Sequence, residues 1–395
     1  MTTPPRFPRE LLQTSKSERL AYFCDCTVVH RRLKEAYDNF VEAIINPGGA
    51  ALVFLFGPTG VGKTTLLYQV MKVLIEQNLL AMALDPGFIP VATVEARSPE
   101  LGNFDWKDYY KSVLGALADP FVEYKLKTRS SRTYGSGKEQ HLVRSKANLS
   151  SIREDVEYTM SQRQLIAFLV DEAQRFTKMA SGRRLQDQMD AIVSMAGMTN
   201  TLHGLFGTYE LLEFRNLSAQ LSRRSIDIHF QRYQVEYSED IIDFKRVLKS
   251  FACQMPLPEE PDLELHWEYF YERSIGCVGI VKDWLTQALR KALDAEASTL
   301  TLVHLKPYAP SVSKCMQMIT EAIEGEKALI EDETELIKLR QKLGLTAISS
   351  PIAKEAFPDN VANSVQTSKT SRKKRNPGER NPHRDVIGGN QNVSW

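Results

Sequence analysis

The sequence lacks the features of a membrane or secreted protein. Its apolar runs fall short of the about 18 residues that a membrane-spanning helix needs, and residues 1–20 hold no apolar signal core. The 5 cysteines form no C-x-x-C pair, so they provide neither a disulfide framework nor the usual zinc spacing. We therefore expect a cytoplasmic protein with reduced cysteines and no membrane association.

The chain also lacks an excess of charge of either sign. Its 50 Lys and Arg residues face 49 Asp and Glu residues, a net charge of +1, which excludes a uniformly basic nucleic-acid binder. This balance still allows a local basic patch. With 395 residues, 43% of them hydrophobic, the chain is long enough for about two or three domains with a sizeable core.

Short apolar runs typical of buried strands alternate with segments of helical periodicity as far as residue 230. The expected helices cover 25–45, 63–77, 106–117 and 184–195, and the expected strands cover 51–56, 91–97, 165–174, 202–208 and 226–230. This alternation predicts an α/β fold in which helices flank a parallel sheet. Beyond residue 233 the pattern is helical only, with several helices over 238–295, one over 311–342, and then a polar tail.

A glycine-rich loop, GPTGVGKT, follows the first expected strand and leads into a helix. It fits the whole pattern G-x-x-x-x-G-K-[ST], in which backbone N–H groups and the helix N-terminus bind phosphates. In this pattern Lys63 reaches the β- and γ-phosphates and Thr64 ligates Mg²⁺, so we expect ATP and Mg²⁺ as cofactors. A chance glycine turn is the alternative, and the flanking strand and helix disfavour it. The expected nucleotide-binding residues are Gly57, Pro58, Thr59, Gly60, Val61, Gly62, Lys63, Thr64 and Thr65.

Polar residues end the next two buried strands along the chain. The run LIAFLVDEAQ places two acids at the strand edge where ligands of open α/β sheets bind. We expect Asp171 to orient the magnesium shell and Glu172 to polarise the attacking water, which favours an ATPase over a small-molecule kinase. We expect Thr208 to sense the γ-phosphate or to help hold the water. The alternatives are a solvated acid pair and a threonine that caps the following turn.

Two arginines, Arg223 and Arg224, stand immediately before the short strand at 226–230. In ATPases that work as rings or filaments, an arginine supplied by a neighbour stabilises transition-state charge in the nucleotide site. We expect one of the two to have this role, and a surface pair bound to nearby acids is the alternative. Lys282, one turn into the helix after GCVG, is a candidate for a lid contact with the nucleotide, at a place where Arg is usual.

A basic segment, 124–153, interrupts the alternation of strands and helices. It carries 8 Lys and Arg residues and the single acid Glu139. Because neutralised phosphates dominate nucleic-acid affinity, we expect this segment to contact DNA, although a solvated face or a flexible insertion is the alternative. The RKKR run in the tail is ambiguous among a phosphate tether, a docking peptide and a solubilising tail. The expected DNA-binding residues are Lys125, Lys127, Arg129 and Arg132.

Together these stretches resemble the AAA+ family and, within it, the TnsC-type and TniB-type target-selection ATPases of transposons. The resemblance covers residues 15–300 and departs from the family in two places, the Lys282 position and the region after residue 300. It is carried, in matching order, by SKSERLAYFCDCTVVHRRL, FGPTGVGKTT, NFDWKDYYKSVLGALADP, LIAFLVDEAQ, GTYEL, LSRRSIDIHFQRY and GCVGIVKDWL.

The resemblance implies an ATP-loaded protein that assembles as rings or helical filaments on double-stranded DNA. It would link a TniQ-like or TnsD-like target selector, or a CRISPR effector, to the transposase, and hydrolysis would drive disassembly. The implied organisation has an AAA+ P-loop domain followed by a helical lid and a disordered tail. Its segments are an N-terminal arm at 1–20, the nucleotide-binding domain at 21–235, the lid at 236–310, a helix at 311–347 and a disordered basic tail at 348–395.

Two other classes of function remain open from the sequence. One is a helicase-loader or clamp-loader-like DNA remodeller, and the other is a signalling P-loop NTPase that does not bind DNA. The paired arginines and the basic segment favour the DNA-bound classes, because an arginine finger acts across a subunit boundary. Only the family resemblance separates a transposition regulator from a remodeller. The sequence contains no evident transposase triad, so we expect other proteins to cut and join DNA.

Overall fold

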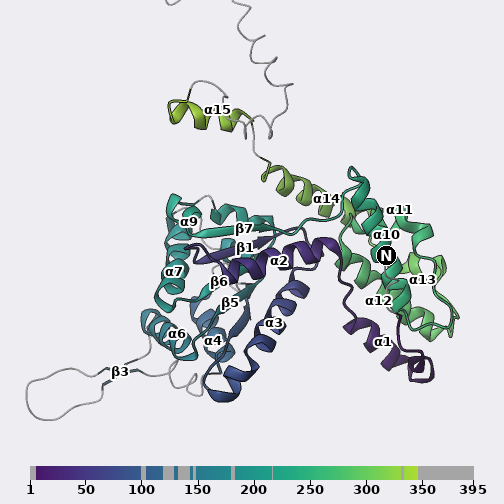
Figure 1. Cartoon of the computed structure of the whole chain (residues 1–395), viewed down its shortest axis with the longest axis horizontal. Coiled ribbons are helices and arrows are strands. Elements are labelled where there is room, and N and C mark those ends of the chain that lie inside the picture. Colours follow the sequence, from purple (N-terminus) through teal and green to yellow (C-terminus); the bar gives the residue numbers. More distant parts are fainter. Residues whose placement is uncertain are drawn as a thin grey trace, which may run out of the picture. The chain divides into compact units, whose positions relative to one another are not determined.

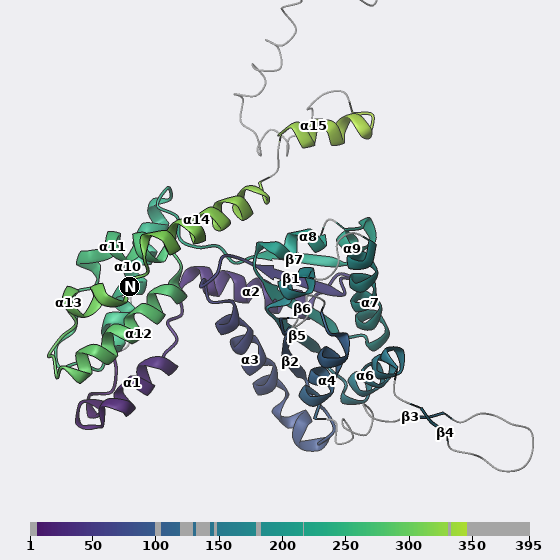
Figure 2. The same ribbon diagram turned by 180° about the vertical axis from the view of Figure 1, so that it is seen from behind.

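Figures 1 and 2 show the computed structural model of the chain from opposite sides. The described residues up to Leu329 belong to one compact unit, and those from Ile330 onward belong to a second. Within the described part of the chain, every helix is too short or too polar to cross a membrane. The structure describes residues 6–98, 104–118, 129–131, 143–145, 148–178, 183–215, 217–330 and 333–345.

A parallel five-stranded sheet forms the centre of the first unit, in the order β2-β5-β6-β1-β7. The central strand β1 pairs in register with β6 on one side, Leu52 opposite His203, and with β7 on the other, Leu52 opposite Ser225. This arrangement confirms the predicted α/β fold with helices around a parallel sheet. The strands are β1 (Leu52–Phe56), β2 (Val91–Glu95), β5 (Ala167–Asp171), β6 (Leu202–Gly207) and β7 (Ser225–His229).

Both faces of the sheet are covered by helices, which explains why β1 is apolar at every position. Successive side chains of a strand point to opposite faces. Phe54 and Phe56 pack in one core cluster with residues of α4, α6 and α7, while Val53 and Leu55 pack in another with residues of α2 and α3. These helices are α2 (Arg31–Ile45), α3 (Lys63–Leu84), α4 (Trp106–Ala116), α6 (Leu149–Arg163) and α7 (Arg183–Thr199).

Helix α6 was not predicted, and it begins inside the basic segment 124–153. Asn148 caps it by accepting a hydrogen bond from the backbone N–H of Ser151 at 2.8 Å. Ile152 and Val156 are fully buried in the core and hold the helix against the sheet domain. Earlier in the same segment, β3 (Arg129–Ser131) pairs antiparallel with β4 (Val143–Ser145).

A third core cluster belongs to the helices that follow the sheet, and the N-terminal arm packs on it. The arm is not extended throughout, because a helix begins at Lys16 with Ser15 and Glu18 in a capping box. Phe23 of this helix is fully buried against Phe251. The elements are η1 (Arg9–Gln13), α1 (Lys16–Asp25), α10 (Ser238–Gln254), α11 (Trp267–Ser274), α12 (Val278–Asp294) and α13 (Leu302–Leu305).

The single helix predicted over 311–342 is interrupted. Helix α14 (Val312–Lys327) ends where Leu329 turns to pack against the core of the sheet domain. Helix α15 (Glu333–Lys342) lies in the second unit. The tail expected to be disordered, 348–395, lies outside the described residues.

Short elements connect β6 to β7 and complete the edge of the sheet. Thr208 precedes the one-turn helix η3, which is followed by two short α-helices. Their order places Arg223 and Arg224 directly before β7, as the sequence indicates. The bounds are η3 (Tyr209–Leu211), α8 (Leu212–Arg215) and α9 (Ala219–Arg223).

Candidate nucleotide-binding site

The glycine loop leaves the end of β1 and becomes the first turn of α3. Gly60 and Gly62 have φ of 78° and 113°, in the left-handed region that favours glycine. Gly57 lies so close to the chain after β7 that a Cβ there would stand 2.3 Å from the carbonyl oxygen of Phe230. The glycines therefore allow a tight backbone loop at the helix N-terminus, where N–H groups bind phosphate.

Lys63 occupies the centre of this loop. Its Nζ donates hydrogen bonds to the carbonyl oxygens of Gly57 at 3.0 Å and Pro58 at 2.9 Å. Burial lowers the pKa of Lys63 to about 8. The ammonium group is thus held by backbone carbonyl oxygens of the glycine loop. The N–H groups of the same loop are the ones that would contact a bound phosphate.

Thr64, in the first turn of α3, lies next to Asp171 at the end of β5. Thr64 Oγ1 donates a hydrogen bond to Asp171 Oδ2 at 2.8 Å. Burial raises the pKa of Asp171, and the Thr64 hydrogen bond partly opposes that shift. A hydroxyl and a carboxylate at the phosphate end of the loop are oxygen ligands of the kind that Mg²⁺ prefers, so these residues fit a magnesium–nucleotide complex.

Glu172 follows Asp171 and has a left-handed backbone, with φ of 54°. Its Oε2 accepts a hydrogen bond from Gln174 Nε2 at 2.7 Å and lies 3.6 Å from the guanidinium of Arg175. Arg175 also binds the end of β2, at the Glu95 carboxylate (2.6 Å) and the Ala96 carbonyl (2.7 Å). The carboxylate expected to act on water is therefore held by two residues of the segment η2 (Ala173–Lys178).

Thr208 lies at the end of β6, next to β5 in the sheet. Its Oγ1 is buried and has no hydrogen-bond partner among the described residues. Its backbone N–H donates to Gln174 Oε1 at 3.3 Å. An unpaired buried hydroxyl beside the phosphate loop fits a γ-phosphate or a water as its missing partner.

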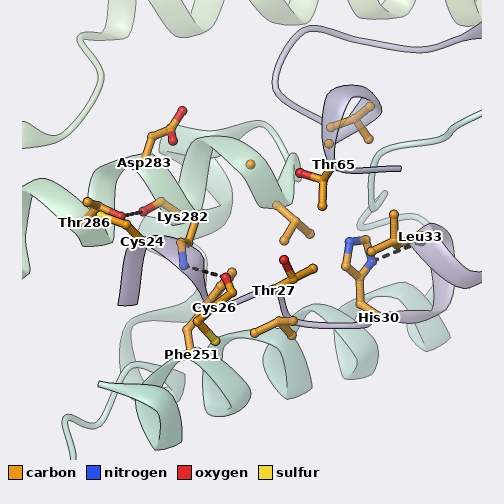
Figure 3. Close-up of a pocket in the computed structure, with 15 residues that line it drawn as sticks. Cys24, Cys26, Thr27, His30, Leu33, Thr65, Phe251, Lys282, Asp283 and Thr286 are labelled. Atoms are coloured by element: carbon orange, nitrogen blue, oxygen red, sulfur yellow. Dashed lines mark hydrogen bonds between the residues drawn. The ribbon is translucent and has the colours of Figure 1, made fainter. Parts of the chain in front are cut away.

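A cavity of about 320 Å³ opens beside the loop (Figure 3). It is lined by the connection from α1 to α2, by the glycine loop and the start of α3, by α12, and by Phe251 of α10. Gly279 of α12 lies against the loop, since a Cβ there would stand 2.5 Å from the Gly60 carbonyl oxygen. The cavity has the position and size for the base and sugar of a nucleotide. Lining residues include Thr27, His30, Gly62, Thr65, Gly279 and Lys282.

Lys282 lines this cavity but bonds to the N-terminal helix (Figure 3). Its Nζ donates to the carbonyl oxygens of Cys26, at 2.7 Å, and of Phe23, and lies 4.1 Å from the centroid of the Phe23 ring. Burial lowers the pKa of Lys282. In this structure the ammonium group satisfies carbonyls at the end of α1.

The two arginines before β7 differ in their surroundings. Arg224 lies against α7, where a Cβ on Gly197 would stand 3.2 Å from its guanidinium. Its carbonyl oxygen accepts a hydrogen bond from the Ala51 N–H at 2.8 Å. Arg223 is exposed at the end of α9, and no residue of the described part of the chain pairs with its guanidinium. Arg223 is therefore the more exposed of the two, and neither guanidinium has a hydrogen bond or an ion pair within the described part of the chain.

The residues expected to bind DNA are not gathered into a described site. Arg129 begins β3, whereas Lys125, Lys127 and Arg132 lie outside the described residues. By contrast, the structure brings together Lys63, Thr64, Asp171, Glu172 and Thr208 at one edge of the sheet.

Sequence reasoning missed the second set of residues around the site. Gln174 and Arg175 hold Glu172, and Thr27 and His30 line the cavity. The only local signal for Gln174 was its place two residues after Glu172. Nothing local indicated Thr27 or His30, which reach the cavity because the connection before α2 passes beside α12.

The strand order, the phosphate-binding loop and the acid pair after β5 define a P-loop nucleotide-binding protein with the AAA+ fold. Residues 45–214 match the family model of an AAA domain. No curated protein matches the chain.

Three of the solved structures similar to this chain have low sequence identity to it. A Walker-type ATPase of Pyrococcus abyssi is 19% identical with a TM-score of 0.41, covering 81% of this chain and 80% of that one. The ORC1 protein of Aeropyrum pernix in complex with DNA is 16% identical with a TM-score of 0.48, covering 73% and 68%. The ORC2 protein of the same organism is 13% identical with a TM-score of 0.47, covering 92% and 87%.

Proposed function

We propose that this protein is an ATPase that assembles on duplex DNA in its ATP-bound state and regulates transposition. It links a target-site selector to a transposase, and hydrolysis of ATP ends the assembly. The observation that carries the ATPase proposal is the convergence of Lys63, Thr64, Asp171, Glu172 and Thr208 at the carboxyl edge of the sheet. These residues provide a cation for phosphate, ligands for Mg²⁺, a base for water and a free hydroxyl.

Each group has a distinct role in hydrolysis. Lys63 leaves the Gly57 and Pro58 carbonyls to bind the phosphates, and Thr64 and Asp171 would hold Mg²⁺. Bound Mg²⁺ would neutralise charge on the β- and γ-phosphates. Glu172 takes up a proton from the water that attacks the γ-phosphorus to form inorganic phosphate, and Thr208 donates a hydrogen bond to the γ-phosphate. ADP leaves as the bond from the γ-phosphorus to the β-γ bridging oxygen breaks.

The assembly proposal rests on Arg223. Strand β7 begins at Ser225, so Arg223 lies at the amino ends of the parallel strands, whereas the phosphate loop follows their carboxyl ends. At about 3.3 Å per residue, the length of β1 separates these edges by more than about 13 Å. Arg223 therefore serves the nucleotide of a neighbouring subunit, and a ring or a filament supplies such neighbours.

The DNA and transposition parts of the proposal rest on the sequence. The excess of positive charge in 124–153 suits a phosphate backbone. The resemblance to TnsC-type and TniB-type proteins supports a transposase and a TniQ-like or TnsD-like selector as partners. A helicase-loader-like role would use the same nucleotide site.

Electron microscopy of the protein with duplex DNA tests this function. Rings or filaments are expected with ATP or a non-hydrolysable analogue and not with ADP. A variant with Lys125, Lys127, Arg129 and Arg132 neutralised should bind ATP normally, lose assembly on DNA and show a smaller salt dependence of DNA binding. Assembly that is the same with ATP and with ADP would contradict the proposed ATP-dependent assembly. Unchanged DNA affinity in the variant would place the DNA-binding surface elsewhere.

A further inference from the structure

Gln174 connects Glu172, which follows β5, with Thr208, which follows β6. Its side-chain Nε2 donates to Glu172 Oε2 at 2.7 Å, and its Oε1 accepts from the Thr208 N–H at 3.3 Å. A backbone N–H only donates and a carboxylate only accepts, so one orientation of the amide satisfies both partners. The side chain therefore has a defined direction, from the end of β6 to the end of β5.

The surroundings of Gln174 leave its amide little freedom. The residue is 8% exposed. Gly207 has no side chain where the amide lies, and a Cβ at that position would stand 2.5 Å from Gln174 Oε1. Any larger residue at 207 would displace the amide from Thr208. Burial and close packing make this a rigid connection.

Glu172 is consequently held from both neighbouring strands of the sheet. Strand β5 lies between β2 and β6. Arg175 ties Glu172 toward β2 through the Glu95 carboxylate, and Gln174 ties it toward β6 through Thr208. The direction of the Glu172 carboxylate depends on which of these partners it keeps.

We propose that Gln174 is a positioning residue that couples the orientation of Glu172 to Thr208. This inference rests on the proposed function, in which Glu172 acts on water and Thr208 meets the γ-phosphate. A displacement of Thr208 on binding the γ-phosphate moves its backbone N–H, and the Gln174 amide passes that movement to the carboxylate. Glu172 is then aimed at water only when a triphosphate is present.

Two substitutions separate positioning from packing. Gln174→Glu keeps the size and the acceptor for the Thr208 N–H but replaces the donor to Glu172 by an acceptor. Gln174→Ala removes both links. Because small misplacements of a catalytic group are costly, we expect kcat for ATP hydrolysis to fall about 10- to 100-fold in both variants, with the KM and the ATP affinity unchanged. A loss that came from packing alone would appear in the Ala variant and spare the Glu variant.

Glu172→Gln, measured in parallel, distinguishes the two proposals. If Glu172→Gln abolishes hydrolysis and Gln174→Glu retains the wild-type kcat, the positioning role is overturned while the ATPase proposal stands. If Glu172→Gln itself retains the wild-type kcat, the proposed role of Glu172 fails. Thermal unfolding shows whether each variant is folded, and if Gln174→Ala is not, the isosteric Gln174→Glu decides.

Discussion

Gly325 of α14 packs directly on the ring of Tyr209, the residue that follows Thr208. A Cβ at position 325 would stand 2.1 Å from Tyr209 Cγ. The Tyr209 hydroxyl is hydrogen-bonded to His229 Nε2 at 2.8 Å, so the ring has little room to withdraw. The last turns of α14 therefore rest on the residue that follows Thr208 at the end of β6.

Gly325→Ala should destabilise the protein by about 1–3 kcal/mol, because the added methyl group overlaps a ring that is fixed by its hydrogen bond. Gly115→Ala is a matched control, since Gly115 lies in α4 with no atom within 4 Å of a built Cβ. That control should gain about 0.5–1 kcal/mol from helix propensity. Thermal and denaturant unfolding measure both changes. Equal stability of the two variants would mean that α14 does not rest on Tyr209.

Arg223→Ala should lower kcat about 10³-fold without weakening ATP binding, because an arginine finger acts on the transition state of a neighbour. Arg224→Ala is the matched control and should alter stability more than hydrolysis, since Arg224 lies against α7. Mixing Arg223→Ala with Lys63→Ala subunits tests the shared site. The first keeps a nucleotide loop and the second keeps an arginine, so the mixture should recover activity that neither variant has alone. Full activity of Arg223→Ala by itself would exclude the finger.

The place of the glycine loop between β1 and α3 was predictable because its signals are local. The run Leu52–Phe56, the glycine loop and the start of α3 are contiguous, and the backbone geometry that glycine allows is encoded in the loop itself. The acids after β5 were predictable because parallel strands deliver their carboxyl ends to one edge. These local features indicate the fold class and the candidate metal and phosphate residues.

Contacts between distant segments were not predictable. Lys282 bonds to Cys26, which is 256 residues away, and Gln174 bonds to Thr208, which is 34 residues away. Helix α6 did have a signal, because Ile152, Val156 and Met160 recur at helical spacing, but the preceding basic segment obscured it. Periodicity records which residues are buried and says nothing about their partners.

Lys282→Met should loosen the N-terminal helix and weaken ATP and ADP binding by the same factor. The methionine keeps the contact with the Phe23 ring but loses the donors to the Phe23 and Cys26 carbonyls. Hydrogen exchange in α1 should rise by about tenfold, since charge-assisted hydrogen bonds are lost. Lys291→Met, an exposed substitution on the same helix, is the control. Loss of ATP affinity alone, with α1 still protected, would instead support the lid contact between Lys282 and the nucleotide that the sequence predicts.

The pH dependence of ATP binding should report the charge of Lys63. Burial lowers its pKa to about 8 from the ordinary 10.5, so the free protein holds a neutral Lys63 above that pH. Phosphate binds the charged form, and affinity should be constant below pH about 8 and fall about tenfold for each further unit as the lysine loses its proton. Titration of a fluorescent ATP analogue between pH about 7 and 9.5 measures this slope.

The lowered pKa of Lys63 predicts the opposite pH dependence for the stability of the nucleotide-free protein, which should rise with pH. Between pH 8 and 10.5 the unfolded chain binds more protons at Lys63 than the folded chain does. The free energy of unfolding should therefore rise with pH through this window, by about 3 kcal/mol from this group, and the gain should be absent below it. Lys63→Met, which carries no titrating group, isolates the effect from the tyrosines that titrate in the same range. If wild type and Lys63→Met changed stability in parallel with pH, the buried lysine would be charged throughout, and the decline in ATP affinity would need another cause.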